Sequence, residues 1–197
     1  MRCTDNRYSA ERQQFDLAVR LIRHEARTHI ISQCTGFSQD RIRKLYTSYF
    51  RFGGQPSVRR QRGKSPTNIG YLVRNATTQS QSSTLAGLFT LFGLMTVSRT
   101  LKTGRRNPDS ALSFGQLFCQ AYETYLHLHP ETDVSFEHAW NLYHALTDRL
   151  ELVLADCGRC GNIYVQDALA LDRGRCPACR SRGKTDMPIR TAGPALS

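Results

Sequence analysis

The sequence predicts a mainly α-helical protein that ends in a small cysteine-rich subdomain. Two observations indicate this fold class. Apolar residues recur at three- and four-residue steps along much of the first 155 residues, and two Cys-x-x-Cys motifs follow within residues 156–180. A chain of 197 residues with 40% hydrophobic residues is long and apolar enough to fold around its own core. Disulfide bonds are therefore not needed to hold the fold together.

Three helices are expected within residues 1–50. Apolar residues at positions 15, 18, 19 and 22 have the spacing of an amphipathic helix over roughly Ser9–His24. A second, shorter helix is expected over about Ala26–Cys34, and a third over Gln39–Phe50. Ser38 precedes the third helix and is a natural N-cap, because its hydroxyl can accept a hydrogen bond from a free backbone N–H of the first turn.

The rest of the chain divides into four regions. Residues 51–70 hold four glycines and two prolines and predict a basic, irregular linker. Residues 71–155 are expected to form a helical core and partner interface, with a buried helix over Ser82–Leu101 and two amphipathic helices separated at Pro130. The apolar positions of these two helices are Phe114, Leu117, Phe118, Ala121, Tyr122, Tyr125 and Leu128, then Phe136, Ala139, Trp140, Tyr143, Leu146, Leu150 and Leu154. Residues 156–180 contain the cysteine motifs, and residues 181–197 are expected to be a disordered tail.

The second and third helices have the sequence pattern of a helix-turn-helix. This motif needs glycine at the turn for positive φ, then an apolar residue, a capping hydroxyl, and apolar residues four and seven positions after the cap. Gly36, Phe37, Ser38, Ile42 and Leu45 meet these requirements. The pattern indicates DNA binding, although a three-helix packing unit with the same turn is the alternative.

The residues expected to contact DNA lie on the outward face of the third helix and in the linker. Arg and Gln can pair with guanine and adenine edges, Asp can accept from cytosine, and Lys more often neutralises phosphate. The candidate DNA-contacting residues are Arg27, Ser38, Gln39, Asp40, Arg41, Arg43, Lys44, Arg59, Arg60 and Arg62.

The charge distribution also favours a polyanionic partner. The formal net charge is +11; residues 1–64 contribute 14 basic and 5 acidic residues (+9), residues 65–150 contribute 6 and 6, and residues 151–197 contribute 7 and 5. Nucleic acid is the usual partner of such a surface, but a basic membrane-surface segment has the same charge count. A solvated arginine-rich surface is the third interpretation, since 23 of the 27 basic residues are arginine.

Four of the seven cysteines have the spacing of a zinc site. Cys157 and Cys160 form one Cys-x-x-Cys motif, and Cys176 and Cys179 form the second after 15 intervening residues. Two such knuckles supply four thiolates to one tetrahedral Zn²⁺ ion, and residues 162–166 between them alternate like a short strand of a zinc ribbon. We expect one structural zinc per chain. Unmetallated thiols or two redox pairs are the alternatives for these four cysteines.

A catalytic role for the metal is disfavoured. Four thiolates close the coordination shell, whereas catalytic zinc keeps an open position. His129 and Glu131 followed by the first knuckle resemble the signature of zinc deaminases, but Asp156 stands where that signature has proline and the second knuckle is left without a role. We therefore expect no enzymatic activity and no small-molecule substrate.

The motifs occur in a specific order along the chain. The residues concerned are Ala26, Arg27, Ile31, Ser32, Thr35, Gly36, Ser38, Arg41, Lys44, Leu45 and Tyr46, then Gly63 and Pro66, then Ala121, Tyr122, Tyr125, Pro130, Ala139 and Trp140, and finally the four cysteines with Gly161. This order resembles the flagellar transcriptional regulator FlhC family over roughly residues 10–180. The chain departs from the family pattern at Tyr71-Leu72, where an aromatic pair is usual, and in its enlarged basic linker.

The resemblance implies a bacterial transcription activator without catalysis. It implies a hetero-oligomer with the FlhD subunit, binding to promoter DNA of flagellar operons and recruitment of RNA polymerase, and it implies that the four cysteines hold zinc. The alternative function is a zinc-ribbon protein-interaction adaptor without sequence-specific DNA binding. The longest mostly apolar run, Leu85–Val97, has 13 residues, and the N-terminus lacks the apolar core of a signal peptide. We therefore expect a cytoplasmic protein without a membrane segment.

Overall fold

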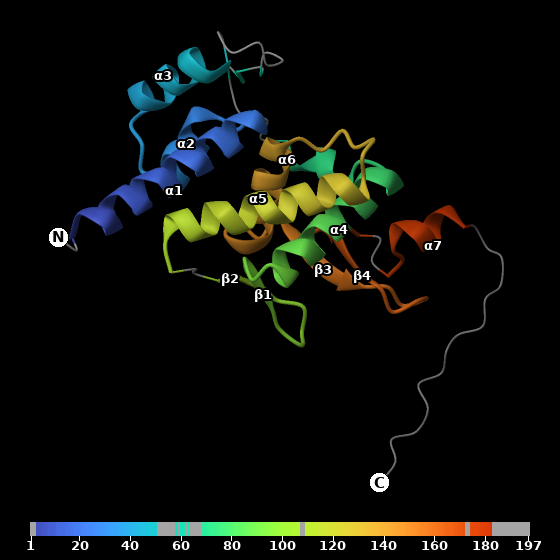
Figure 1. The fold of residues 1–197 in the computed structure, drawn as a ribbon. Coiled ribbons are helices and arrows are strands. Elements are labelled where there is room, and N and C mark those ends of the chain that lie inside the picture. Colours follow the sequence, from blue (N-terminus) through green and yellow to red (C-terminus); the bar gives the residue numbers. More distant parts are fainter. Residues whose placement is uncertain are drawn as a thin grey trace.

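The computed structural model confirms that the chain is mainly helical (Figure 1). It describes residues 3–50, 58, 60, 61, 63, 68–106, 109–171 and 174–182, with only the backbone described for residues 3–7. The helices are α1 (Cys3–Arg23), α2 (Thr28–Thr35), α3 (Gln39–Phe50), α4 (Ala76–Leu91), α5 (Ala111–Leu128), α6 (Phe136–Thr147) and α7 (Pro177–Ser181), with a 3-10 helix η1 at Ile69–Val73. Two antiparallel hairpins pair β1 (Met95–Val97) with β2 (Thr103–Arg105) and β3 (Leu152–Asp156) with β4 (Ile163–Asp167).

The core is an aromatic cluster between α4, α5 and α6. Phe118 of α5 lies at its centre, with ring centroids 5.3 Å from Phe89 of α4 and 5.1 Å from Trp140 of α6. Side-chain caps fix where these three helices begin, because Asn75, Ser110 and Ser135 each accept from a backbone N–H of the first turn. The amphipathic pattern therefore predicted the helices of the core, although Leu128 at the end of α5 is exposed.

The N-terminal helices pack on one side of this core. α1 is longer at its start than the pattern predicted, α2 runs one residue beyond its predicted end, and α3 has the predicted bounds. An ion-paired triad joins α1 to α5: Arg20 donates two hydrogen bonds to the carboxylate of Glu123, and His24 Nε2 lies 2.8 Å from Glu123 Oε1. α3 lies at the far end of this group in Figure 1.

A glycine allows α2 and α5 to approach closely. A Cβ atom at Gly115 would lie 2.8 Å from both Cys34 Cβ and Leu17 Cδ2, closer than real Cβ contacts. Glycine at this position therefore sets the spacing between α5 and the N-terminal helices, which the apolar pattern alone does not reveal.

The prediction of a helix over Ser82–Leu101 is wrong at both ends. α4 starts at Ala76 and stops at Leu91, where Gly93 takes a φ of +70° and Leu94 N–H donates to Phe89 O. This left-handed residue ends the helix and turns the chain into β1. The apolar run continues into the strand because Leu94 and Met95 are buried, so hydropathy alone did not mark the change.

The helix predicted to extend from Phe136 to Leu154 is also too long. α6 ends at Thr147, Leu150 has a φ of +54° and is exposed, and Leu154 belongs to β3. β3 pairs with β4, so the strand expected between the knuckles is present together with a partner that the sequence did not predict. Within the described ranges, no helix has both the length and the hydropathy needed to cross a membrane.

Candidate metal centre and exposed face of α3

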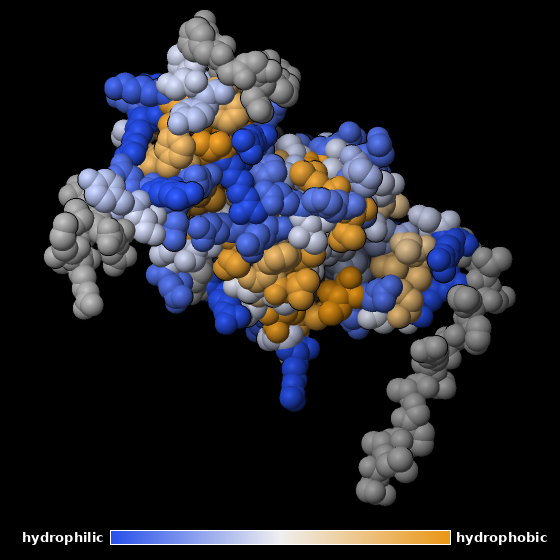
Figure 2. All heavy atoms as spheres, viewed as in Figure 1, coloured by the Kyte–Doolittle hydropathy of each residue, from blue (hydrophilic) through white to orange (hydrophobic). Residues whose placement is uncertain are grey.

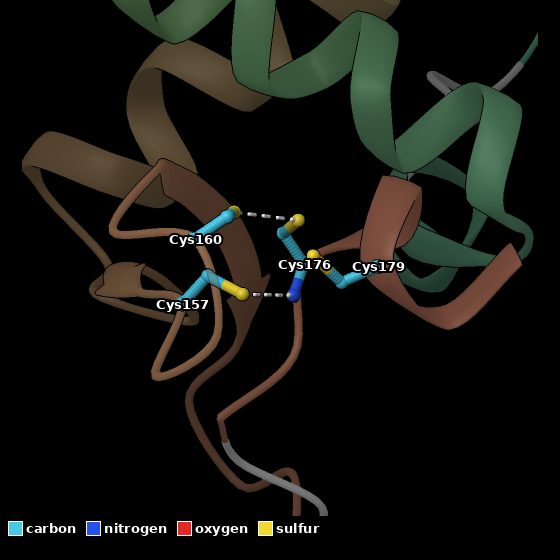
Figure 3. Close-up of side chains that lie close together, drawn as sticks. All are labelled: Cys157, Cys160, Cys176 and Cys179. Atoms are coloured by element: carbon cyan, nitrogen blue, oxygen red, sulfur yellow. Dashed lines mark hydrogen bonds between the residues drawn. The ribbon is translucent and has the colours of Figure 1, made fainter. Parts of the chain in front are cut away.

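Four cysteine side chains from two segments converge on one point (Figure 3). Cys157 and Cys160 lie in the turn that joins β3 to β4, and Cys157 N–H donates to Asn162 O across that turn. Cys176 immediately precedes α7, and Cys179 lies within it. The hairpin and the short helix therefore hold the two knuckles opposite each other.

The sulfur geometry fits a single metal ion. All four Sγ atoms lie within 4.8 Å of one another, and Cys160 Sγ is 3.6 Å from Cys176 Sγ. A tetrahedral zinc site with bonds of about 2.3 Å places its sulfurs about 3.8 Å apart. The six cysteines whose side chains are described, these four included, are free thiols rather than disulfides. The cluster is therefore a candidate metal centre of the four-thiolate type.

Backbone groups prepare one sulfur to be a thiolate. Burial alone raises the pKa of Cys157, but N–H groups of Cys176, Cys160 and Arg159 oppose burial and lower the pKa to about 6. The Cys176 N–H lies 3.2 Å from this sulfur. Gly161 has a φ of +73° and donates its N–H to Cys157 O, which closes the turn.

The other sulfurs cannot all ionise without a cation. The Cys160 side chain, burial and the other two sulfurs raise the pKa of Cys179 to about 12, and burial is the main factor that raises the pKa of Cys176. Four negative charges within 4.8 Å repel one another strongly, and a divalent cation at their centre removes that repulsion. The chemistry of the donor set therefore fits a soft divalent metal.

A buried amide on α4 fixes both segments of the cluster. Gln79 is 4% exposed; its Nε2 donates to Val165 O of β4 at 2.8 Å, and its Oε1 accepts from the guanidinium of Arg180 in α7. Ser83, one turn later, accepts from Val165 N–H at 2.9 Å. Since Arg180 directly follows Cys179, α4 positions the second knuckle as well as the strand that follows the first. The sequence gives no sign of this role, because Gln79 is one of two glutamines in an uncharged helix without a distinctive pattern.

The polar residues expected on the outer face of α3 are exposed in the structure. Ile42 and Leu45 are buried against α2, and the positions between them face outward. Ser38 Oγ accepts from Arg41 N–H at 3.3 Å, so Ser38 caps the helix as expected. The exposed residues of this face are Ser38, Gln39, Asp40, Arg41, Arg43 and Lys44.

Two arginines of α3 already have acidic partners. Arg43 Nη1 lies 2.7 Å from Asp40 Oδ1, and Arg41 Nη2 lies 2.7 Å from Glu11 Oε1 of α1. The Arg41 guanidinium also covers the Phe37 ring at 4.0 Å from its centroid. These pairs reduce the free positive charge of α3 below the count that the sequence gives.

The remaining candidate residues have different surroundings. Arg27 is 12% exposed, forms an ion pair with Glu137 of α6 and donates to Gly63 O at 2.6 Å, so its guanidinium is engaged inside the protein. Arg60 lies over the Tyr46 ring of α3, 5.7 Å from its centroid. Arg59 and Arg62 fall outside the described residues, as do the tail beyond residue 182 and most of the linker.

No protein-family model matches this chain, and no curated protein matches it either. The function is therefore inferred from the cysteine cluster and the exposed face of α3.

Proposed function

We propose that this chain is the DNA-binding subunit of a flagellar transcription activator of the FlhC type. It would act in the cytoplasm with an FlhD subunit, bind promoter DNA, recruit RNA polymerase and hold one structural Zn²⁺ ion. The observation that carries the proposal is the three-residue connection Gly36–Ser38 between two packed helices, the second of which presents an uninterrupted polar face.

The connection between α2 and α3 supports a DNA-reading role. Gly36 has a φ of +72° and donates its N–H to Ser32 O, and Phe37 is buried beneath the turn. A short turn with a left-handed glycine is typical of helix-turn-helix units, whose second helix enters the major groove at its N-terminal half. In this chain that half carries Gln39, Arg43 and Lys44, which are side chains that bind base edges or phosphates.

The cysteine cluster supports a structural zinc. Cys157, Cys160, Cys176 and Cys179 supply four soft ligands and leave no open coordination position, so a metal held there stabilises the fold and activates no water. Exposed leucines support the partner interface: Leu91 at the end of α4 and Leu128 at the end of α5 are 76% and 58% exposed. Apolar side chains so exposed at helix ends are candidates for burial by a second subunit.

The second candidate function is a protein-interaction adaptor, and the ion pairs of α3 favour it. If Arg41 and Arg43 keep Glu11 and Asp40 as partners, α3 offers DNA only one unpaired cation, Lys44, among the residues of this face. The two functions differ in their dependence on salt, because release of counterions from phosphates gives a steep negative slope of log K against log salt.

The test selects the preferred site from a random 40-base-pair duplex library, with the chain alone and co-purified with a candidate FlhD subunit. Arg43→Ala is expected to weaken binding to the selected site by about 1–3 kcal/mol and binding to a scrambled duplex much less. Arg12→Ala is the matched control, since it removes one exposed arginine from α1. Selection of no preferred site by either preparation would overturn the proposal in favour of the adaptor. Equal weakening on both duplexes for Arg43→Ala would reduce α3 to a phosphate-binding helix.

A further inference from the structure

The β1–β2 hairpin has an ordered, hydrophilic tip. Ser98 N–H donates to Lys102 O at 2.9 Å, Lys102 N–H donates to Ser98 Oγ at 3.0 Å, and Leu101 takes a φ of +59° in the turn between them. The hairpin projects from the body of the protein in Figure 1, and Figure 2 shows a hydrophilic projection at the same place. The turn is therefore a defined element that extends away from the core.

This hairpin is a local concentration of positive charge. Residues 75–108 contain four basic residues and no acidic residue, and all four basic residues lie in or beside the hairpin: Arg99, Lys102, Arg105 and Arg106. The charge of residues 65–150 sums to zero because the six acidic residues of that region all come later, from Asp109 onward. The net charge of residues 65–150 therefore does not reveal the positive charge of the hairpin, which the structure shows.

Most of these cations have no acidic partner. Arg105 pairs with Asp148 at 2.6 Å, but Arg99, Lys102 and Arg106 form no ion pair with any residue that the structure describes. Arg99, Lys102 and Arg106 are also exposed. The hairpin thus offers more unpaired positive charge than the outer face of α3, where Arg41 and Arg43 are neutralised by acidic partners.

The root of the hairpin lies beside the helix that precedes α3. Arg105 and Arg106 line a hollow of about 270 Å³ together with Gln33 of α2, and the hollow also contacts the start of α5 and the end of α6. The hollow therefore joins the root of the hairpin, at Arg105 and Arg106, to α2, the helix that precedes α3.

We propose that the β1–β2 hairpin is a second DNA-binding element, which contacts the phosphate backbone through Arg99 and Lys102 at its tip. This inference rests on the proposed function and adds a surface to it. Flexible basic side chains beside the hydroxyls of Ser98 and Thr100 suit phosphate oxygens, and two-stranded ribbons are a known form of DNA-binding element. Phosphate contacts carry no sequence information, so the contribution of the tip is expected to be independent of base sequence.

The test is a salt titration with a fluorescent 40-base-pair duplex of random sequence, about 136 Å long. Arg99→Gln with Lys102→Gln is expected to reduce the slope of log K against log salt by about 0.9 for each phosphate that the variant no longer neutralises, or about 1.8 in all. Arg12→Gln with Arg149→Gln is the matched control, because it removes the same charge from arginines that already have acidic partners. Thermal melting of each variant verifies that the fold is intact.

The outcomes separate this inference from the proposed function. A hairpin variant whose slope of log K against log salt equals that of the control overturns the inference. Loss of binding in Lys44→Gln would then still support DNA binding by α3. A hairpin variant with a reduced slope supports the inference even if Lys44→Gln has no effect, which would count against α3. Polyglutamate provides the other arm: if the hairpin variant loses binding to polyglutamate but not to DNA, the hairpin binds acidic proteins and the inference is wrong. Both proposals are overturned if the wild-type protein binds no duplex, neither alone nor co-purified with the candidate FlhD subunit.

Discussion

Loss of one cysteine ligand should open the cysteine cluster while the helical core remains folded. The cluster has its own small core, in which Cys157, Tyr164 and Cys176 are buried apart from the main one. Burial of three side chains contributes at most about 3 kcal/mol each, or roughly 9 kcal/mol together. A structural zinc contributes on the order of 10 kcal/mol. Loss of a zinc ion held there would thus remove about half of the sum of these two contributions.

Cys179→Ser is the sharpest form of this perturbation. We expect the zinc content to fall from one ion per chain and trypsin to cleave after Arg159 and Arg175, which lie next to the metal ligands. Val165 of β4 belongs to the main core, so fragments that contain α4 to α6 should remain protected. The assay combines metal analysis of the purified protein with limited proteolysis and mass spectrometry, before and after treatment with chelator.

The matched control is Cys34→Ala, which removes a buried thiol from the main core and should leave zinc content unchanged. Wild-type protein without stoichiometric metal and with a proteolysis pattern insensitive to chelator would refute the reasoning. So would a Cys179→Ser protein that keeps its full zinc content, because the cluster would then not depend on its fourth ligand.

Two further predictions concern the fold that carries these sites. Gly115→Ala should destabilise the protein, because overpacking costs about 1–3 kcal/mol and the gain in helix propensity is only about 1 kcal/mol. Gly87→Ala on the open face of α4 should instead stabilise it by up to about 1 kcal/mol. Urea unfolding measures both changes in the free energy of unfolding, and changes of the same sign would contradict the close approach of α2 and α5. The Arg20 hydrogen bond holds the pKa of Glu123 below its usual value, so the stabilising contribution of Glu123 is present above the unfolded pKa and is lost as pH falls through the folded pKa. Glu123→Gln should therefore lower the free energy of unfolding by up to about 1 kcal/mol at pH 7 and by less near pH 3. Stability curves of the two proteins that stay parallel between pH 7 and pH 3 would count against this ion pair.

Local patterns predicted the elements whose structure is determined locally. The bounds of α3 follow from the Ser38 cap and from the apolar spacing of Ile42 and Leu45, all within one short segment. The cysteine cluster follows from two four-residue turns whose chemistry leaves few other uses. Both features depend on residues close in sequence, which is why their spacing is visible without the fold.

Of the four strands, only β4 was expected from the sequence; β1, β2 and β3 were missed because tertiary contacts decide them. Leu150 and Leu154 continue the helical spacing of α6, but Leu154 lies on β3, which is held by backbone hydrogen bonds to β4. Likewise, Leu94 and Met95 extend an apolar run that a buried helix and a buried strand share. Only Gly93 distinguishes the two at that point, and one glycine is weak evidence in a mostly apolar run of 13 residues that also contains Gly87.

The net charge summed along the sequence does not predict how much positive charge is free at the protein surface. The excess of +9 over residues 1–64 predicts a strongly basic N-terminal face, yet Arg20, Arg27, Arg41 and Arg43 all lie in ion pairs. Each ion pair reduces the positive charge that is free to bind DNA. Replacing an intramolecular carboxylate partner by a phosphate gains less binding free energy than neutralising an unpaired cation. A DNA-binding chain with α3 so paired needs unpaired cations elsewhere to reach the salt dependence typical of its class. The unpaired cations of the β1–β2 hairpin, in a region whose charge sums to zero, meet that need.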